Sequence, residues 1–280
     1  MKLQQVSESC FAVLNEKNLL CDANSGLINL GGGVVVDTQS DLPHGRRMIE
    51  LFGKVWRGMP RRVVNTHEDG DHVWGNQHFE GAEIIAHRTV RERMPQVADP
   101  KETQQLIEES DRFLSRLRLS ALHPGALALA RQLKQGHDFE DIRLVLPTTV
   151  FDEQHVLDLD GTEVQLIYVG PCHQIGDTIV HVPEEKVVFA GDVIFRECTP
   201  MGWNGGTREG LRRGPGRGPC QGHRGRVLTR LTKSMSLAMK LISGRPAAGR
   251  CGRRCRDSMA RGWRGGASRA DLSFFKWRYQ

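Results

Sequence analysis

Apolar residues gather in short runs along the first two hundred positions, and polar or turn-forming residues separate these runs. Short β-branched or apolar runs between turn formers are typical of strands. The pattern predicts strands at residues 10–15, 25–30, 34–38, 61–66 and 82–87. Apolar residues at helical spacing predict a helix around 89–94 and another over 42–55, which has one apolar face formed by Met48, Leu51, Phe52 and Val55.

The pattern changes between residues 101 and 136, where a helical insert is predicted with one side formed by Leu106, Phe113, Leu117 and Leu122. A hairpin follows, with strands at 155–159 and 162–169 joined by Asp160-Gly161, a pair that favours a type I′ turn. Two more strands are predicted at 178–182 and 186–192. Strands at both ends with helices between them indicate an α/β protein with two sheets covered by helices.

The periodic pattern is lost near Gly205. Beyond it only residues 227–242 have the spacing of an amphipathic helix, and ordinary globular sequence returns at 271–277. We therefore predict a domain over residues 1–205 and an anomalous, disordered or aberrant Arg/Gly-rich segment over residues 206–280.

The charge changes at the same place. Residues 1–205 hold 20 Lys and Arg against 30 Asp and Glu, whereas residues 206–270 hold 15 Arg and 2 Lys against 2 acidic residues. The net charge of +6 is thus an average over an acidic domain and a strongly basic segment.

Composition also bears on where the protein acts. No apolar run is long enough to span a membrane, and the first ten residues lack the apolar stretch of a secretory signal. Seven cysteines, an odd number without regular spacing, suit free thiols better than a disulfide framework. We expect a cytoplasmic protein that does not act on membranes.

Residues that bind metals are concentrated at predicted strand ends. The stretch NTHEDGDHVWGN holds five ionisable residues in six positions, namely His67, Glu68, Asp69, Asp71 and His72. Such a group is costly to bury unless it binds something. His173 and Asp177 follow the hairpin, and Asp192 ends the last strand. Imidazoles with carboxylates suit zinc, iron or manganese, and two cations need about this many ligands.

These motifs, in this order, resemble those of the metallo-β-lactamase-fold hydrolases over about residues 6–205. The family pattern is H-x-H-x-D-H, then a single His, an Asp and a last His near the C-terminus. His67 matches the first position, Asp71 and His72 the D-H pair, His173 the middle His and Asp192 the metal-bridging Asp. The resemblance implies a four-layer αββα sandwich with a dinuclear site at one edge.

Two positions depart from the family pattern. Asp69 stands where the family usually has His, and a carboxylate there would favour harder metals. The family's last His lies in a GHG-like turn, whereas the one later histidine in this sequence is His223, in QGHRGR, whose surroundings do not resemble a strand end.

The resemblance implies hydrolysis by a metal-activated water. Two zinc ions, or iron or manganese in their place, would be held by His67, Asp69, Asp71, His72, His173 and Asp192. Asp71 would also hold or orient the attacking water. The substrate would be a small molecule with an ester, thioester, lactone, amide or phosphodiester bond, and the insert is long enough to form a lid suited to a small or elongated apolar substrate.

Plainer roles apply to several residues. Taken alone, the HEDGDH stretch also fits capping or surface groups at a strand end. Asp177 is interpreted as orienting His173 or capping the next strand, and Cys172 as a small buried hydrophobe. The other histidines, among them His44 and His137, show no ligand spacing and are expected to have surface or packing roles.

The basic segment allows three interpretations. It resembles RG-rich segments that bind nucleic acid, which would make the protein a nucleic-acid-binding protein or a metallo-nuclease. A small zinc site is a second interpretation, formed by Cys220, His223, Cys251 and Cys255. The third is a pair of frameshifts, because GC-rich coding DNA read out of frame gives an excess of Arg, Gly, Pro, Ala, Cys and Trp, and the family's last His belongs in this interval.

Overall fold

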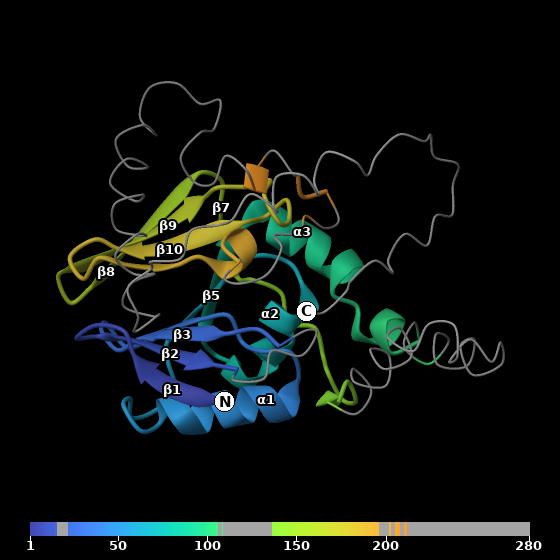
Figure 1. Cartoon of the computed structure of the whole chain (residues 1–280), viewed down its shortest axis with the longest axis horizontal. Helices are drawn as coiled ribbons and strands as arrows, with labels where there is room; N and C mark the ends of the chain where they lie inside the picture. Colours follow the sequence, from blue (N-terminus) through green and yellow to red (C-terminus); the bar gives the residue numbers. More distant parts are fainter. Residues whose placement is uncertain are drawn as a thin grey trace, which may run out of the picture. The chain divides into compact units, whose positions relative to one another are not determined.

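The computed structural model describes residues 1–15, 22–105, 108, 136–195, 202, 205–207 and 210–211 (Figure 1). The described strands form one sheet of seven strands and one of four. The predicted α/β class with two sheets is confirmed, and the fold is that of an αββα sandwich. The described residues supply a helical layer and both sheets.

The seven-stranded sheet follows the order of the sequence. Its strands are β1 (Lys2–Gln5), β2 (Cys10–Leu14), β3 (Ser25–Ile28), β4 (Val34–Val36), β5 (Arg62–Asn65), β6 (Glu83–His87) and β7 (Thr149–Phe151). Neighbours are antiparallel from β1 to β4 and parallel from β4 to β7. All of β4 is buried, as expected for a β-branched strand covered on both faces.

The four-stranded sheet is antiparallel throughout. Its order is β11 (Val187–Phe189), β10 (Thr178–Val182), β9 (Thr162–Tyr168) and β8 (Gln154–Leu159). Asp160 and Gly161 join β8 to β9 with φ angles of 56° and 91°. Both angles are positive, which confirms the predicted type I′ turn.

The helices are short. They are α1 (Leu42–Phe52), α2 (Gly70–Val73), η1 (Trp74–Phe79), α3 (Arg88–Val97) and η3 (Gly191–Val193). The predicted helix over 42–55 is α1, which ends at Phe52 because the chain turns at Gly53. Val55 lies beyond the helix, but it packs against the same apolar cluster as Met48, Leu51 and Phe52. The predicted apolar face is therefore confirmed.

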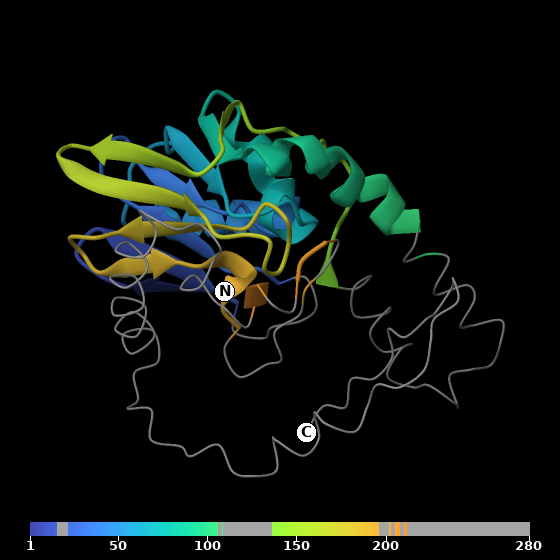
Figure 2. The same ribbon diagram turned by 90° about the horizontal axis from the view of Figure 1, so that it is seen from above.

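Two apolar clusters fill the spaces between the layers. One fills the space between the sheets, with Ile28, Val64, Leu157 and Val180 among its members. The other joins α1 to the outer face of the seven-stranded sheet. Figures 1 and 2 show the strands of the second sheet, coloured yellow-green to gold, lying over the blue strands of the first. The parallel strand β5 is thereby buried, and its carboxyl end opens into the loop with the HEDGDH stretch.

Some elements were not predicted. Strands β1 and β7 are missing from the apolar pattern because β1 is polar and half-exposed and β7 has a single buried residue, Phe151. Residues 101–105 of the predicted insert are helical, while most of the insert lies outside the described residues. The predicted helix over 227–242 and the whole of residues 212–280 lie outside them as well.

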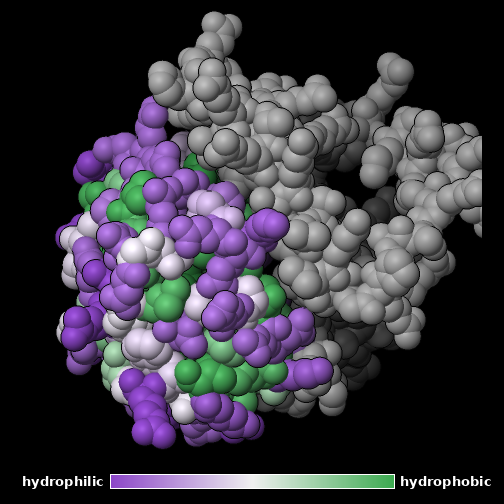
Figure 3. Space-filling view, turned by 90° about the vertical axis from the view of Figure 1, so that its left-hand side faces the viewer, coloured by the Kyte–Doolittle hydropathy of each residue, from purple (hydrophilic) through white to green (hydrophobic). Residues whose placement is uncertain are grey.

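The surface of the described part is largely polar. Figure 3 shows hydrophilic residues spread over one side of the molecule, with apolar ones between them. Within the described residues, the large apolar side chains that are exposed are Met59 and Val156. None of the described helices combines the length and apolar character that crossing a membrane requires.

Candidate metal centre

Three loops that follow strands bring the predicted ligands together. The stretch from His67 to His72 follows β5, His173 lies in the connection from β9 to β10, and Asp192 lies in η3 after β11. The two sheets are joined here, because the backbone N–H of Thr178 in β10 donates to the carbonyl of Thr66 at 2.8 Å. This bond aligns the loop after β5 with the loop before β10.

His67 lies at the centre of the group. Its side chain is fully buried. The ring centroid of His67 is 4.0 Å from that of His72 and 5.2 Å from that of His173. Three imidazoles from two loops are therefore packed around one point.

The first donor group consists of His67, Asp69 and His173, whose ligand atoms all lie within 4.8 Å of one another. The Oδ2 atom of Asp69 is 3.0 Å from Nε2 of His173 and 3.5 Å from Nε2 of His67. Gln174 donates a hydrogen bond to the other oxygen of Asp69. The Asp at the position where the family pattern has His thus faces the same point as the two imidazoles.

The second donor group consists of His67, His72 and Asp192, again within 4.8 Å. Nε2 of His72 is 3.5 Å from Asp192 Oδ1 and 3.7 Å from Asp71 Oδ2. Asp192 Oδ2 is 3.8 Å from Nε2 of His173, so Asp192 lies between the two groups. All six predicted residues are brought together, and their role as ligands stays a prediction.

Asp37 fixes the orientation of the imidazoles. Its Oδ2 atom is 2.8 Å from Nδ1 of His72 and accepts a hydrogen bond of 2.8 Å from Thr66 Oγ1. Because that hydroxyl donates to Asp37, it accepts from Nδ1 of His67 at 3.0 Å. In their neutral form both rings therefore carry the proton on Nδ1, which leaves the lone pair of Nε2 free to bind a metal ion.

Close packing places the short helix α2 that carries Asp71 and His72. A Cβ atom at Gly75 would lie 1.9 Å from the carbonyl oxygen of Thr38, so only glycine fits there. The same backbone of Thr38 donates to the carbonyl of His72 at 2.9 Å. The end of α2 is thereby held against the segment that follows β4.

The electrostatics of the site favour cations. Burial would lower the pKa of His72, but the carboxylates of Asp71, Asp37 and Asp192 raise it well above its usual value. Burial, together with the carboxylates of Asp69 and Asp192, raises the pKa of Asp71. Four carboxylates surround three imidazoles, so the site has an excess of negative charge that a divalent cation would balance.

The residues present fit a metal ion. Nε2 of His67 is buried without a hydrogen-bond partner, although it carries a lone pair. Leaving such an atom unpaired costs about 1–3 kcal/mol. Imidazole nitrogens combined with carboxylate oxygens form a donor set suited to zinc, iron or manganese.

Several supporting residues were not identified as such from the sequence. Glu68 is fully buried, but it accepts from Arg93 Nε at 2.9 Å and from the backbone of Gly176 at 3.2 Å, so it serves the scaffold rather than a donor group. Two features of the sequence could have indicated this role: Glu68 lies between the predicted ligands His67 and Asp69, and the next predicted helix carries Arg93.

The loop that carries His173 is held by Asp177. Its Oδ2 atom accepts from the backbone N–H groups of Cys172 at 3.1 Å and Gln174 at 2.9 Å, on either side of the histidine. This agrees with the predicted orienting role. Cys172 is buried, and burial raises the pKa of its thiol to about 12, as expected for an inert packing residue.

Comparison with known proteins gives the family. A family model described as the metallo-beta-lactamase superfamily matches residues 19–233, which include all six predicted ligands. The chain is 34% identical over 55 residues to the 2,4-dinitroanisole O-demethylase subunit alpha of Nocardioides sp. (strain JS1661). That match covers 20% of this chain and 17% of the relative, so the chain matches about a sixth of the length of this curated relative.

Solved structures were compared as well. A double mutant of the sec-alkyl sulfatase PisA1 is similar over 93% of this chain and 43% of its own, with a TM-score of 0.51 and 16% identity. A metallo-beta-lactamase from Pontibacter korlensis covers 71% and 74% of the two chains, with a TM-score of 0.47 and 12% identity. A metallo-beta-lactamase family protein from Thermus thermophilus covers 83% and 70%, with a TM-score of 0.47 and 19% identity.

Proposed function

The chain belongs to the metallo-beta-lactamase superfamily, which supports a metal-dependent hydrolase in general, and we propose that its candidate metal centre hydrolyses an ester, thioester, lactone or amide. The observation that carries the proposal is the position of His67. Its buried and unpaired Nε2 lies where the two donor groups meet. A metal pair would satisfy this atom and the surrounding carboxylates together.

The two donor groups suggest how the ligands divide. His67, Asp69 and His173 would hold one ion, and His72 and Asp192 would complete the site for the other. Zinc is the first choice and iron or manganese the alternatives. When bound, the pair would supply Lewis acidity and a water of lowered pKa.

Asp71 is suited to orient the attacking water. Its side chain is 22% exposed, whereas those of His67 and His72 are 0% and 3% exposed. Water and substrate therefore reach Asp71 more readily than the buried imidazoles. The carboxylate would accept a hydrogen bond from the water and direct its lone pair at the bond to be broken.

The substrates for a first screen follow from the kinds of bond that the proposed hydrolase would break. Esters, thioesters, lactones and amides share a carbonyl that the attacking water can reach, and they come first. The names of two similar proteins, a sec-alkyl sulfatase and a 2,4-dinitroanisole O-demethylase subunit, justify adding a secondary alkyl sulfate and 2,4-dinitroanisole.

An alternative is nucleic acid as partner or substrate. The 17 Lys and Arg against 2 acidic residues over 206–270 favour it, because such a segment binds phosphates. Salt-dependent retention of the full chain on nucleic acid, with cleavage that needs added metal, would support this function over the first.

The proposal is tested by metal content together with activity. We expect elemental analysis to find about two more zinc, iron or manganese ions per chain in the wild type than in the His67→Ala variant, and that variant to lose hydrolysis. His155→Ala, in the edge strand β8, is the control and should keep both. If the wild-type chain holds no more metal than His67→Ala and hydrolyses nothing in the screen, the proposal is wrong.

A further inference from the structure

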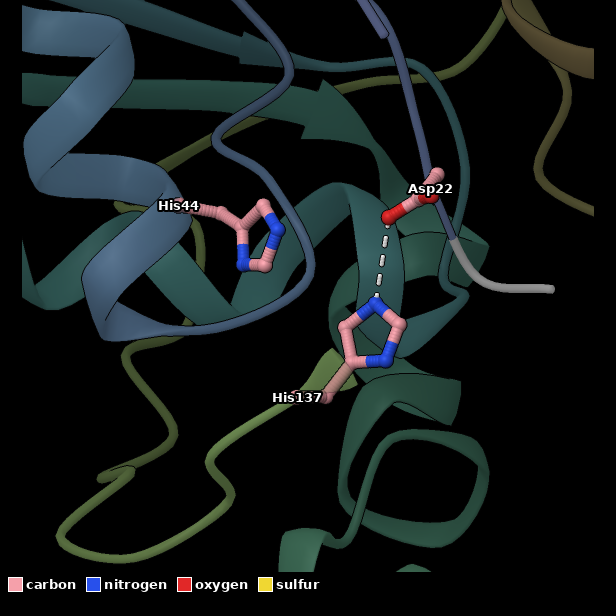
Figure 4. Close-up of side chains that lie close together, drawn as sticks. All are labelled: Asp22, His44 and His137. Carbon is pink, nitrogen blue, oxygen red and sulfur yellow. Dashed lines mark hydrogen bonds and ion pairs between the residues drawn. The ribbon is translucent and has the colours of Figure 1, made fainter. Parts of the chain in front are cut away.

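A second group of metal-ligand side chains, Asp22, His44 and His137, shares no residue with the candidate metal centre. One ligand atom from each of the three lies within 4.8 Å of the others. Figure 4 shows that they come from separate segments: Asp22 precedes β3, His44 lies in the first turn of α1, and His137 follows the insert. The chain thus brings them together only on folding.

His44 is oriented by a buried carboxylate. Oδ1 of Asp41 is 2.6 Å from Nδ1 of His44 and also accepts from the backbone N–H of His44 at 2.7 Å, as the N-cap of α1. Its Oδ2 atom accepts from the backbone of Asp138 at 2.9 Å. With Nδ1 donating to Asp41, Nε2 of His44 carries the lone pair and points toward the other two side chains (Figure 4).

This pairing is the arrangement that metal-binding histidines commonly have. A carboxylate on one ring nitrogen fixes the tautomer and raises the basicity of the other nitrogen. Asp41 is 1% exposed, so its hold on the ring is not weakened by solvent. Asp41 and Asp37 therefore play the same part in two different clusters.

His137 is buried without full hydrogen bonding. Its side chain is 1% exposed, and Nε2 is 3.2 Å from Oδ1 of Asp22. Nδ1 is buried and has no hydrogen-bond partner within the described residues. The rings of His137 and His44 stack at 5.3 Å. Each imidazole has a carboxylate partner, Asp41 for His44 and Asp22 for His137, so the two rings and Asp22 form a compact group of nitrogen and oxygen donors.

The backbone around the cluster is fixed. Gln39 donates to the carbonyl of Ala23 at 2.9 Å and to Ser25 at 2.7 Å, which ties the residues after Asp22 to the segment that leads into α1. Asp41 ties the residues after His137 to the same helix. The ligands are thus presented by anchored backbone rather than by long free side chains.

We propose that Asp22, His44 and His137 bind a divalent zinc-type cation at a structural site separate from the candidate metal centre. Two imidazoles and one carboxylate are ligands that zinc accepts, and a water would complete the coordination. The bound ion would tie the end of the insert to α1 and to the segment before β3. It would fix where the insert returns to the domain, independently of any hydrolysis.

The test is zinc binding to the full chain in a background that lacks the first centre. We expect the His67→Ala/His173→Ala double variant to bind one zinc per chain in a competitive titration with a zinc chelator. Adding His137→Ala should remove this zinc, whereas adding His155→Ala should leave it. Cobalt(II) in place of zinc should give visible d–d absorption that His137→Ala abolishes.

A conservative variant separates metal binding from folding. Asp22→Asn keeps an oxygen to accept from His137 but removes the charge that a cation needs, so we expect zinc affinity to fall at least about tenfold with an unchanged circular dichroism spectrum. Zinc binding that is unchanged in both Asp22→Asn and His137→Ala would overturn the proposal. Loss of hydrolysis in His67→Ala bears on the first centre alone, so the two proposals fail separately.

Discussion

At the scale of single residues, the candidate metal centre depends on a side chain that is not among its proposed ligands. Asp37 is 2% exposed and accepts hydrogen bonds from the backbone N–H and the hydroxyl of Thr66, each at 2.8 Å, in addition to its bond with His72. It links the first ligand of the motif to the last, because Thr66 in turn orients His67. Its loss should disturb both donor groups at once.

We expect Asp37→Asn to weaken zinc binding by about 10–100-fold and to lower the free energy of unfolding by about 1–3 kcal/mol. The amide replaces an acceptor by a donor that faces His72 or Thr66. Asn also tolerates the left-handed backbone at this position, where φ is 59°, so the change adds no backbone strain.

Zinc titration and urea unfolding measure the two effects of Asp37→Asn. Asp152→Asn is the matched control, because that carboxylate lies on the surface and pairs with Arg88. If the two variants bind zinc equally well, Asp37 does not orient the centre.

The sequence predicts the members of the centre better than their supports. His67, Asp69, Asp71 and His72 lie within six positions after one strand, so their proximity follows from local structure. The bond between Asp37 and His72 spans 35 positions, and that between Asp22 and His137 spans 115. Contacts of this kind depend on how distant segments pack, and spacing along the chain does not contain that information. His44 and His137 were expected to be packing or surface residues for this reason.

At the scale of elements, an ion pair joins helix α3 to the loop after β5 that carries His67 to His72. Arg93 Nε donates to Glu68 Oε1 at 2.9 Å, and Glu68 is fully buried. Burial raises the pKa of Glu68, while the guanidinium of Arg93 opposes that rise. Removing the cation would leave a buried carboxylate next to His67 without its counter-charge.

We expect Arg93→Met to lower the free energy of unfolding by about 3 kcal/mol, measured by urea denaturation at neutral pH. Arg88→Met, in the same helix, is the control and should have no measurable effect, because Arg88 and its partner Asp152 are both exposed. Glu68→Gln combined with Arg93→Met should recover part of the loss. A loss as large in Arg88→Met would show that the helix, not the ion pair, is responsible.

Elements with a strong local signal are the ones that the sequence predicts. The strands β2 to β6, the helix α1 and the turn at Asp160-Gly161 each have a clear apolar period or a turn pair. The strands β1 and β7 have neither, because most of their residues are partly exposed and each strand is ordered by pairing with its neighbour. The predicted elements are thus stabilised largely by local sequence, whereas β1 and β7 are stabilised by tertiary contacts.

At the scale of the whole molecule, two parts of unlike composition occur in one chain. The described fold lies almost entirely within residues 1–205, where acidic residues outnumber basic ones, and the basic excess begins directly afterwards. The match to the superfamily continues to residue 233, into the basic stretch. The position at which the family pattern calls for its last His therefore lies where the composition has changed.

We predict that the coding DNA across residues 206–270, read in one of the other two frames, encodes a GHG-type motif with acidic and apolar residues around it. Resequencing the gene and translating all three frames tests this directly. A chain expressed in the restored frame should then bind metal at the first centre more tightly than the present chain, because it regains a histidine ligand. If neither alternative frame contains such a motif, the basic segment is genuine sequence. Its 15 Arg should then give binding to nucleic acid that weakens steeply as salt is raised.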